Sequence, residues 1–212
     1  DPKHTWEQIK NFKGGNAVFT QPTTPIKCGG APQKIAYLAA DYFRKNKLSN
    51  KTNVIFATPG SVIFGVKPIK ETLMKVIHRY GIHFKPFYAP FKIDADKKIV
   101  YFRNTAPEEN KCVIMEDNTL GEKLSGDTVI EMPFDILHLA PPQTAPQFIK
   151  ESNLVNEAGW LDVDHHTLQH NNYSNIFGLG DVAALPTAKT GAAIRKQVPV
   201  VVDNILILIK HN

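Results

Sequence analysis

The order of apolar segments along the 212-residue chain predicts an α/β fold. Compact strand-like runs at residues 16–21 and 53–58 each precede a helical pattern, and several short strand-like runs follow them. Alternation of strand and helix is typical of a parallel sheet of the nucleotide-binding type, and successive short strands are typical of an antiparallel meander. Hydrophobic residues make up 42% of the chain, which is the composition of a globular protein with a buried core.

The first predicted helix is defined by its apolar spacing. Ile35, Leu38, Ala39 and Tyr42 recur at helical intervals, and Pro32 fits the first turn, where a missing N–H costs nothing. The other predicted elements are a short strand at 61–65, a helix from Pro68 to a stop at Gly81, a strand at 82–84, a hairpin of 88–93 and 99–102, strands at 112–115, 128–132 and 136–139, a helix at 146–150, a strand at 174–178 and a final helix from Thr190.

Charge and cysteine content exclude several classes of protein. The net charge of +5 comes from scattered lysines, which indicates a solvated surface; an anionic membrane face or an acidic partner is the alternative. We expect no nucleic acid partner, because no basic motif interleaved with aromatic residues is present. Two cysteines, Cys28 and Cys112, cannot staple a secreted fold of this size. No apolar run reaches the ~20 residues of a membrane span.

The strongest chemical signal is the segment from Asn175 to Asp181, which ends in Gly-Leu-Gly-Asp. At the end of a predicted strand, Gly180 permits close backbone approach and Asp181 can accept hydrogen bonds from a sugar-like hydroxyl. A helix with small residues begins about ten positions later, at Thr190, and its N-terminus favours negative charge. A turn with an N-capping aspartate is the alternative interpretation.

Cys28 is a candidate redox cysteine. It follows Lys27 and lies a few residues before a predicted helix N-terminus, and both features favour a thiolate. A structural buried cysteine is the alternative for Cys28, and a small core side chain is the interpretation we favour for Cys112.

No metal site is expected. His166 and His170 are four residues apart, close to Asp164 and His165, but the segment has the character of a polar loop, which favours solvated side chains. A nicotinamide site is not expected either. The stretch 58–65 after the second strand carries bulky residues where a dinucleotide fingerprint needs glycine.

Two sequence blocks resemble a known family. "YSNIFGLGD" followed by "ALPTAKTGAA" resembles the closing flavin-binding motif of the disulfide-reductase superfamily of flavoproteins. "NAVFTQPTTPIKCGGAPQK" and "TLQHNNYSNIFGLGD" are similar to sulfide:quinone oxidoreductases, and the resemblance runs from about Trp6 to Lys210. It implies a three-layer, Rossmann-like FAD/NAD(P)-binding fold and an enzyme in which a redox cysteine pair oxidises sulfide and electrons pass through FAD to a membrane quinone.

The resemblance also implies how the chain is organised. Residues 1–140 correspond to the second, NAD-like dinucleotide-fold domain with the redox cysteine, and residues 141–212 to the returning segment of the FAD-binding domain. The family's Gly-x-Gly-x-x-Gly turn and its tail, with the second redox cysteine and amphipathic helices, have no counterpart here. We therefore expect a part of a longer parent protein, inactive and without FAD by itself. The parent would lie peripherally on a mitochondrial inner or bacterial cytoplasmic membrane; a homo-oligomer is left open.

The family's site residues match five positions of this sequence. Cys28 matches one redox cysteine, Gly180 and Asp181 match the contact to the FAD ribityl chain, and Lys189 and Thr190 match the region beside the flavin's pyrimidine edge. Two alternatives remain. One is a sister flavoenzyme, an NADH:quinone reductase or a sulfide dehydrogenase. The other is a non-catalytic domain of the same fold that serves assembly or persulfide sensing.

Overall fold

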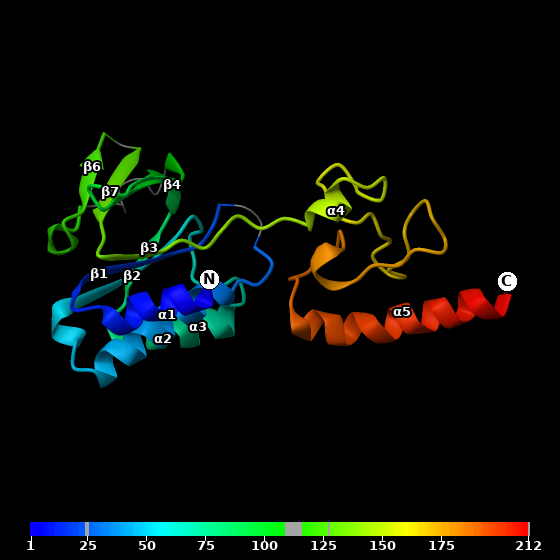
Figure 1. Ribbon diagram of the computed structural model, residues 1–212, viewed down its shortest axis with the longest axis horizontal. Helices are drawn as coiled ribbons and strands as arrows, with labels where there is room; N and C mark the ends of the chain where they lie inside the picture. Colours follow the sequence, from blue (N-terminus) through cyan, green and yellow to red (C-terminus); the bar gives the residue numbers. More distant parts are fainter. Residues whose placement is uncertain (24–25, 109–115, 127, 212) are drawn as a thin grey trace. The chain divides into compact units, whose positions relative to one another are not determined.

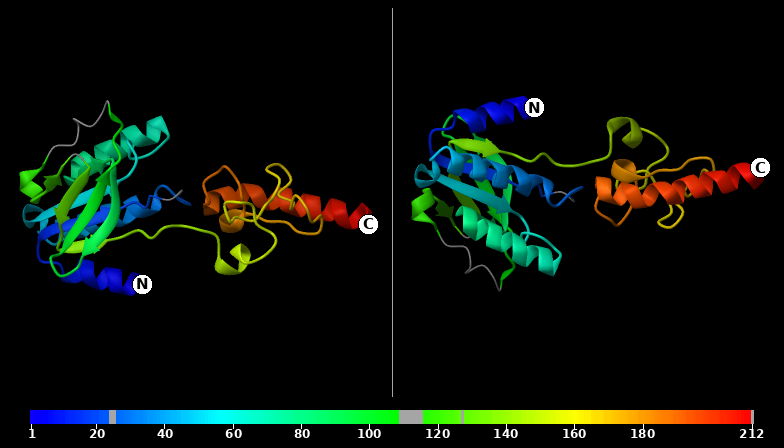
Figure 2. Two further views of the ribbon diagram at one scale, coloured as in Figure 1. Left: turned by 90° about the horizontal axis from the view of Figure 1, so that it is seen from above. Right: turned by 90° about the horizontal axis from the view of Figure 1, so that it is seen from below.

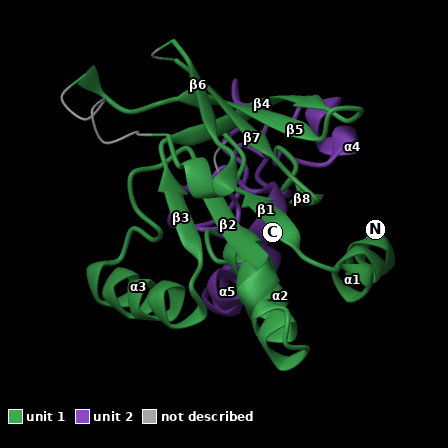
Figure 3. Cartoon of the chain, turned by 90° about the vertical axis from the view of Figure 1, so that its left-hand side faces the viewer, with its two compact units in different colours: residues 1–24, 29–142 green, residues 25–28, 143–212 purple. Residues whose placement is uncertain are grey.

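The computed structural model describes residues 1–23, 26–108, 116–126 and 128–211. The chain divides into two compact units (Figure 3). Unit 1 comprises the described residues of 1–24 and 29–142, and unit 2 comprises those of 25–28 and 143–212. The short segment that contains Cys28 is therefore grouped with the C-terminal part of the chain.

A parallel sheet forms the centre of unit 1, and its strands lie in the order β3-β2-β1-β8. Helix α2 follows the first strand and helix α3 follows the second, so each connection between neighbouring parallel strands contains a helix. The α/β class predicted from the sequence is confirmed. The bounds are β1 (Gly15–Thr20), α2 (Ala31–Lys45), the 3-10 turn η1 (Ser49–Lys51), β2 (Thr52–Thr58), α3 (Lys67–Tyr80), β3 (His83–Pro86) and β8 (Ile136–His138).

A second, antiparallel sheet has the order β4-β5-β7-β6. The predicted hairpin is confirmed as β4 (Tyr88–Asp94) and β5 (Ile99–Asn104), and the predicted strand at 128–132 as β7 (Val129–Pro133). Two short elements were not predicted, the 3-10 turn η3 (Asn118–Leu120) and the three-residue strand β6 (Lys123–Ser125). The strand predicted at 112–115 lies outside the described residues.

Unit 1 has three layers, with helices on one side of the parallel sheet and the antiparallel sheet on the other (Figures 1 and 2). Strand β1 shows how the sequence produces this arrangement, because successive side chains of a strand point to opposite faces. Ala17 and Phe19 pack in the core that includes the helices, whereas Val18 packs with Val100 of the antiparallel sheet. Burial on both faces is typical of a central strand in a parallel sheet.

The buried face of helix α2 coincides only in part with the residues that show the helical spacing: Ala39 is buried, and Ile35 and Tyr42 are partly buried against the same core. Its buried positions include Ala36, Ala39, Ala40 and Phe43, whereas Leu38 is 67% exposed. Small alanine side chains let the helix approach the sheet closely. Ile35, Leu38 and Tyr42 line a cavity of about 600 Å³ on the neighbouring side of the helix. Trp6 and Ile9 of α1 (Pro2–Asn11) line the same cavity. Helix α1 was not predicted.

Helix α3 ends where the sequence predicts. Gly81 takes a left-handed conformation, with φ of 63°, and its N–H bonds back to the last turn. The strand predicted at 61–65 is wrong, because these residues form bends instead. Ile63 in this run is nonetheless buried in the core that the helices form with the parallel sheet, and its carbonyl accepts a hydrogen bond from Gln33. Core burial therefore explains the apolar run without a strand.

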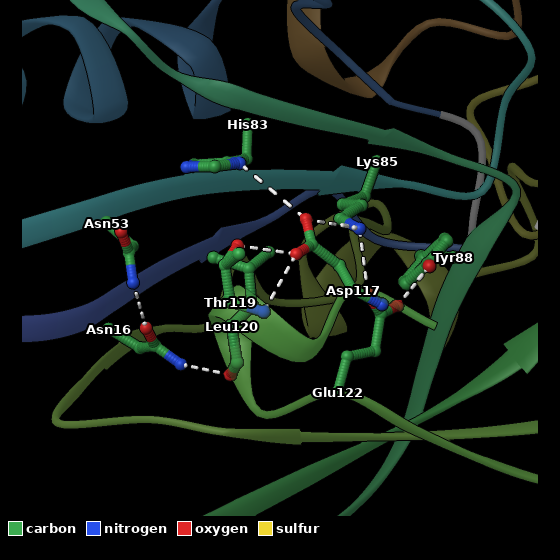
Figure 4. Close-up of polar contacts among 9 residues, drawn as sticks. All are labelled: Asn16, Asn53, His83, Lys85, Tyr88, Asp117, Thr119, Leu120 and Glu122. Atoms are coloured by element: carbon green, nitrogen blue, oxygen red, sulfur yellow. Dashed lines mark hydrogen bonds and ion pairs between the residues drawn. The ribbon is translucent and has the colours of Figure 1, made fainter. Parts of the chain in front are cut away.

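A buried acid lies among basic and phenolic groups in unit 1 (Figure 4). The side chain of Glu122 is fully buried; it accepts a hydrogen bond from the phenol of Tyr88 and lies 2.7 Å from the ammonium of Lys85. Asp117 lies 3.6 Å from the same ammonium and 3.9 Å from His83. Burial, together with the hydrogen bond to Glu122, raises the pKa of Tyr88, so its phenol remains protonated.

The side chain of Asn16 joins the parallel sheet to the 3-10 turn η3 (Figure 4) and to the end of β7. Its Nδ2 donates to the carbonyls of Leu120 and Pro133, at 2.8 and 2.9 Å, and its Oδ1 accepts from Nδ2 of Asn53 at 2.9 Å. Asn16 is buried, and these bonds satisfy its amide.

Unit 2 contains little regular structure beyond its helices. These are α4 (Gln147–Lys150), which confirms the helix predicted at 146–150, and α5 (Gly191–His211), which confirms the final helix. The 3-10 turn η4 (Gly180–Val182) carries the Gly-Asp pair, and the core of the unit is small, with Leu161, Val163 and Ala183 at its centre. Over the described ranges, no helix combines the length and apolar character needed to cross a bilayer.

The strand predicted at 174–178 is wrong. Phe177 forms an isolated bridge with Gln169, and the residues around it are turns and irregular backbone. A strand needs a neighbour that pairs with several of its residues. The described part of unit 2 offers this segment a single bridging position, so its apolar pattern does not become a strand.

Candidate functional site

The candidate site is built in unit 2 from three segments. They are Ile26–Cys28, the Gly178–Asp181 turn, and the residues just before helix α5. Together they carry every site residue predicted from the sequence.

The Gly178–Asp181 turn depends on its two glycines. An added Cβ at Gly178 would lie 2.1 Å from the side chain of Leu161. Gly180 has a φ of 68°, its Cβ would lie 2.9 Å from Ile194, and its N–H donates to Oε1 of Gln197 at 2.8 Å. A side chain at Gly178 would displace the end of Leu161, and glycine adopts the left-handed backbone of Gly180 at the lowest cost. The turn presents Asp181 with a side chain that is 57% exposed.

Lys27 connects the cysteine segment to this turn. Its ammonium lies 3.0 Å from Oδ2 of Asp181, and its side chain is 20% exposed. Its backbone N–H donates to Oε1 of Gln143. The residue before Cys28 is thus held at the turn that the sequence analysis singled out, within one unit.

An indole ring lies beside two ammonium groups. The Nζ of Lys189 is 4.5 Å from the ring centroid of Trp160, and the Nζ of Lys27 is 5.7 Å from it. Both distances are within the range of cation–π attraction. Trp160 was not among the site residues predicted from the sequence. The available signal in the sequence was a tryptophan that follows a glycine, Gly159, in a segment otherwise rich in polar residues.

Lys189 is a half-buried lysine rather than a solvated one. Its Nζ donates to the carbonyl of Ala183 at 2.7 Å. Burial lowers its pKa from the usual 10.5, nearby Lys27 lowers it further, and Asp181 acts in the opposite direction. Its ammonium thus lies against the carbonyl of Ala183 and the ring of Trp160.

Thr190 caps helix α5, because its Oγ1 accepts a hydrogen bond from the N–H of Ala193 at 3.2 Å. The next residue, Gly191, has open space around the position of a Cβ. The first turn of α5 therefore has room beside Gly191.

Cys28 is a half-buried free thiol, two residues before Gly30, the N-cap of α2. The following residue is fixed within unit 1, since buried Gln33 donates through Nε2 to the carbonyl of Gly29 at 2.9 Å. The chain thus reaches Cys28 from an anchored Lys27 and leaves it through an anchored Gly29. Cys112 lies outside the described residues.

The topology also shows which turn would hold a dinucleotide. In unit 1 the first connection from strand to helix joins β1 to α2, and its last residues before the helix are Gly29 and Gly30. A glycine fingerprint belongs to this first turn. The turn after β2, which the sequence analysis compared with the fingerprint, is instead occupied by Ile63 and Phe64.

Both ring nitrogens of His170 have protein partners. The Nε2 of His170 lies 3.1 Å from the carbonyl of Leu154, and its Nδ1 accepts from the N–H of Asn172. Among the residues described, no group of three histidine, cysteine or acidic side chains is arranged to hold a metal ion.

The chain is similar to three curated proteins, all named mitochondrial sulfide:quinone oxidoreductases. The one from Mus musculus is 39% identical over 208 residues, which cover 98% of this chain and 42% of that protein. Those from Dictyostelium discoideum and Schizosaccharomyces pombe are 39% and 35% identical, covering 95% and 97% of the chain and 40% of each relative. No protein-family model matches. The resemblance predicted from the sequence is confirmed, and the chain spans about two-fifths of the length of these relatives.

Solved structures share the fold at lower identity. The sulfide:quinone oxidoreductase of Aquifex aeolicus aligns with a TM-score of 0.75 at 19% identity, over 99% of this chain and 47% of its own. A chain in the mitochondrial ATP synthase of Tetrahymena thermophila aligns with a TM-score of 0.67 at 24% identity, over 97% and 46%. NDH2 of Plasmodium falciparum, solved with NADH, gives 0.55 at 15% identity, over 85% and 34%.

Proposed function

We propose that this chain is part of a FAD-dependent oxidoreductase that oxidises sulfide through Cys28 and delivers the electrons to a quinone. The observation that carries the proposal is the 3.0 Å contact of Lys27 with Asp181. It joins the residue before the candidate redox cysteine to the turn proposed to hold the flavin. The similarity to proteins named sulfide:quinone oxidoreductases extends over 95–98% of the chain and supports the same activity.

The residues of unit 2 fit one side of a flavin site. Asp181 has an exposed carboxylate that can accept a hydrogen bond from a ribityl hydroxyl, and Gly180 leaves the backbone free of a side chain beside it. In the proposal Lys189 and Thr190 lie at the pyrimidine edge, where an ammonium and the N-terminus of α5 stabilise negative charge. Bound FAD would supply the two-electron acceptor and pass the electrons to the quinone.

Cys28 is proposed as one member of a redox pair whose second cysteine lies outside this chain. The sulfur of hydrosulfide attacks the disulfide between them and the S–S bond breaks. One cysteine then carries the new sulfur as a persulfide, and the other leaves as a thiolate with the electron pair of the broken bond.

The cellular setting is part of the same proposal. Because the similar curated proteins are named mitochondrial, we place the parent protein in mitochondria, peripherally bound to the inner membrane where a quinone is available.

Substitution of the cysteines tests this function in the full-length protein. Cys28→Ser should abolish sulfide-dependent quinone reduction while the flavin absorbance is retained, because the serine hydroxyl is no substitute for a redox thiol. Cys112→Ser is the matched control and should keep turnover. Unchanged turnover in Cys28→Ser removes the role assigned to Cys28.

A non-catalytic role is the second candidate, because a chain with this fold occurs in the structure of an ATP synthase. A full-length protein that binds no flavin but co-purifies with a large assembly would favour it. An NADH-dependent enzyme is a further alternative, given the similarity to NDH2. Reduction of the bound flavin by NADH in the absence of sulfide would favour that enzyme.

A further inference from the structure

We propose that Lys27 is a positioning residue that fixes Cys28 beside the flavin-binding turn. The inference rests on the proposed function and adds a residue to it. Lys27 acts through its neighbour and its contacts, and it takes no part in the bond changes at sulfur.

Three contacts within unit 2 hold Lys27. Its ammonium pairs with Asp181 at 3.0 Å, the same ammonium lies 5.7 Å from the ring centroid of Trp160, and its backbone N–H donates to Gln143. The hydrogen bond to Gln143 holds the backbone of Lys27, and the contacts with Asp181 and Trp160 hold its ammonium. A residue held in this way has little freedom to move, and Cys28 is bonded directly to it.

The chain is also fixed just after Cys28. Gln33 is buried, donates to the carbonyl of Gly29 at 2.9 Å and is itself held by the phenol of Tyr37, which donates to its Oε1 at 3.0 Å. Cys28 is therefore the residue at which the chain passes from the anchors of unit 2 to those of unit 1. Of the two anchored neighbours, Lys27 is the one that reaches the turn.

Asp181 can serve both Lys27 and a flavin. Its Oδ2 faces the ammonium of Lys27, and a carboxylate has a second oxygen that can accept a ribityl hydroxyl. One carboxylate then joins the cysteine segment to the cofactor. Precise placement matters because a misplacement of about 1 Å between reacting groups costs up to about a hundredfold in rate.

Amide hydrogen exchange tests whether Lys27 and Asp181 hold the segment around Cys28. The measurement depends on neither bound flavin nor turnover. In the full-length protein, Lys27→Met and Asp181→Asn should each raise amide exchange in residues 26–30 by about threefold, the effect of losing a partly exposed ion pair. The double variant should exchange no faster than either single variant, because the two residues act as a pair. Lys27→Arg, which keeps the charge, should restore protection. Lys45→Met breaks a different lysine–aspartate pair, with Asp41 at 2.7 Å, and should leave the segment unchanged.

Single-turnover reduction of the bound flavin by sulfide then tests positioning. Lys27→Met should slow it about tenfold at unchanged flavin occupancy, and Lys27→Arg should recover it. Unchanged exchange in both Lys27→Met and Asp181→Asn overturns the inference, as does faster exchange with unaltered flavin reduction. If the unmodified protein does not react with sulfide, the proposed function fails, whereas the exchange data still decide whether Lys27 anchors the segment.

Discussion

Lys27 and Asp181 form an ion pair at 3.0 Å although 154 positions separate them in the sequence. They come from the two sequence blocks on which the family resemblance rests, one around Cys28 and one ending in Gly-Leu-Gly-Asp. The structure brings Lys27 of the first block and Asp181 of the second together within unit 2. Trp160, between them in the sequence, lies beside both Lys27 and Lys189.

Replacing Gly180 with alanine should destabilise the turn that presents Asp181. A non-glycine residue at φ of 68° costs about 1–2 kcal/mol, and the new methyl group also meets Ile194. We expect a lower urea midpoint for unit 2 and weaker flavin binding in the full-length protein. Gly191→Ala is the matched control, since a methyl group there meets nothing within 4 Å. Equal midpoints for the two variants would contradict the strain assigned to Gly180.

Lys189 should raise the reduction potential of a bound flavin, because its ammonium stabilises the negative charge gained on reduction. Lys189→Met should lower the midpoint potential by about 20 mV, which corresponds to about 1 kcal/mol for two electrons. A spectroelectrochemical titration of the full-length protein measures this, with Lys189→Arg as the charge-conserving control. A potential that is the same in the methionine variant would place Lys189 away from the flavin.

Glu122 should be important for the stability of unit 1. Removing a fully buried carboxylate leaves the ammonium of Lys85 and the phenol of Tyr88 without their main partner. Glu122→Leu should lower the free energy of unfolding by about 3 kcal/mol, as expected when one member of a buried pair is lost. Chemical denaturation provides the measurement, and Glu71→Gln, on the exposed surface of α3, should have little effect. A loss no larger than that of the Glu71 variant would show that the pair contributes little.

Two histidines should make unit 1 sensitive to mild acid. Burial lowers the pKa of His83 and of His138 from the usual 6.5. At a pH between 6.5 and the folded-state pKa of each histidine, the unfolded chain therefore binds more protons than the folded chain. Stability is fully present above pH 6.5 and is lost as the pH falls through the folded pKa of each histidine.

Urea midpoints at about pH 7.5 and about pH 5.5 would show this loss, and the double variant His83→Gln/His138→Gln should reduce it, since glutamine does not titrate. A pH dependence that is identical with and without the two histidines would assign the acid sensitivity to other groups.

The elements that the sequence predicts well are those with a strong local pattern. Helix α3 has a proline near its start and a left-handed glycine at its end, and both signals are local. The incorrect predictions have a common origin. Residues 61–65 and 174–178 are apolar runs that the fold buries or bridges at a single position, and an apolar run by itself does not show whether a neighbouring strand is present. The buried face of α2 depends on how closely the helix approaches the sheet.

The sequence alone determined the α/β class, the resemblance to sulfide:quinone oxidoreductases, and the choice of Cys28, Asp181 and Lys189 as candidate site residues, since each follows from a local pattern or a motif. Tertiary structure decided that Lys27 reaches Asp181 and that Trp160 lies beside two ammonium groups. These contacts join residues far apart in the chain, and they form only when packing and backbone hydrogen bonds bring distant segments together. No local spacing encodes them.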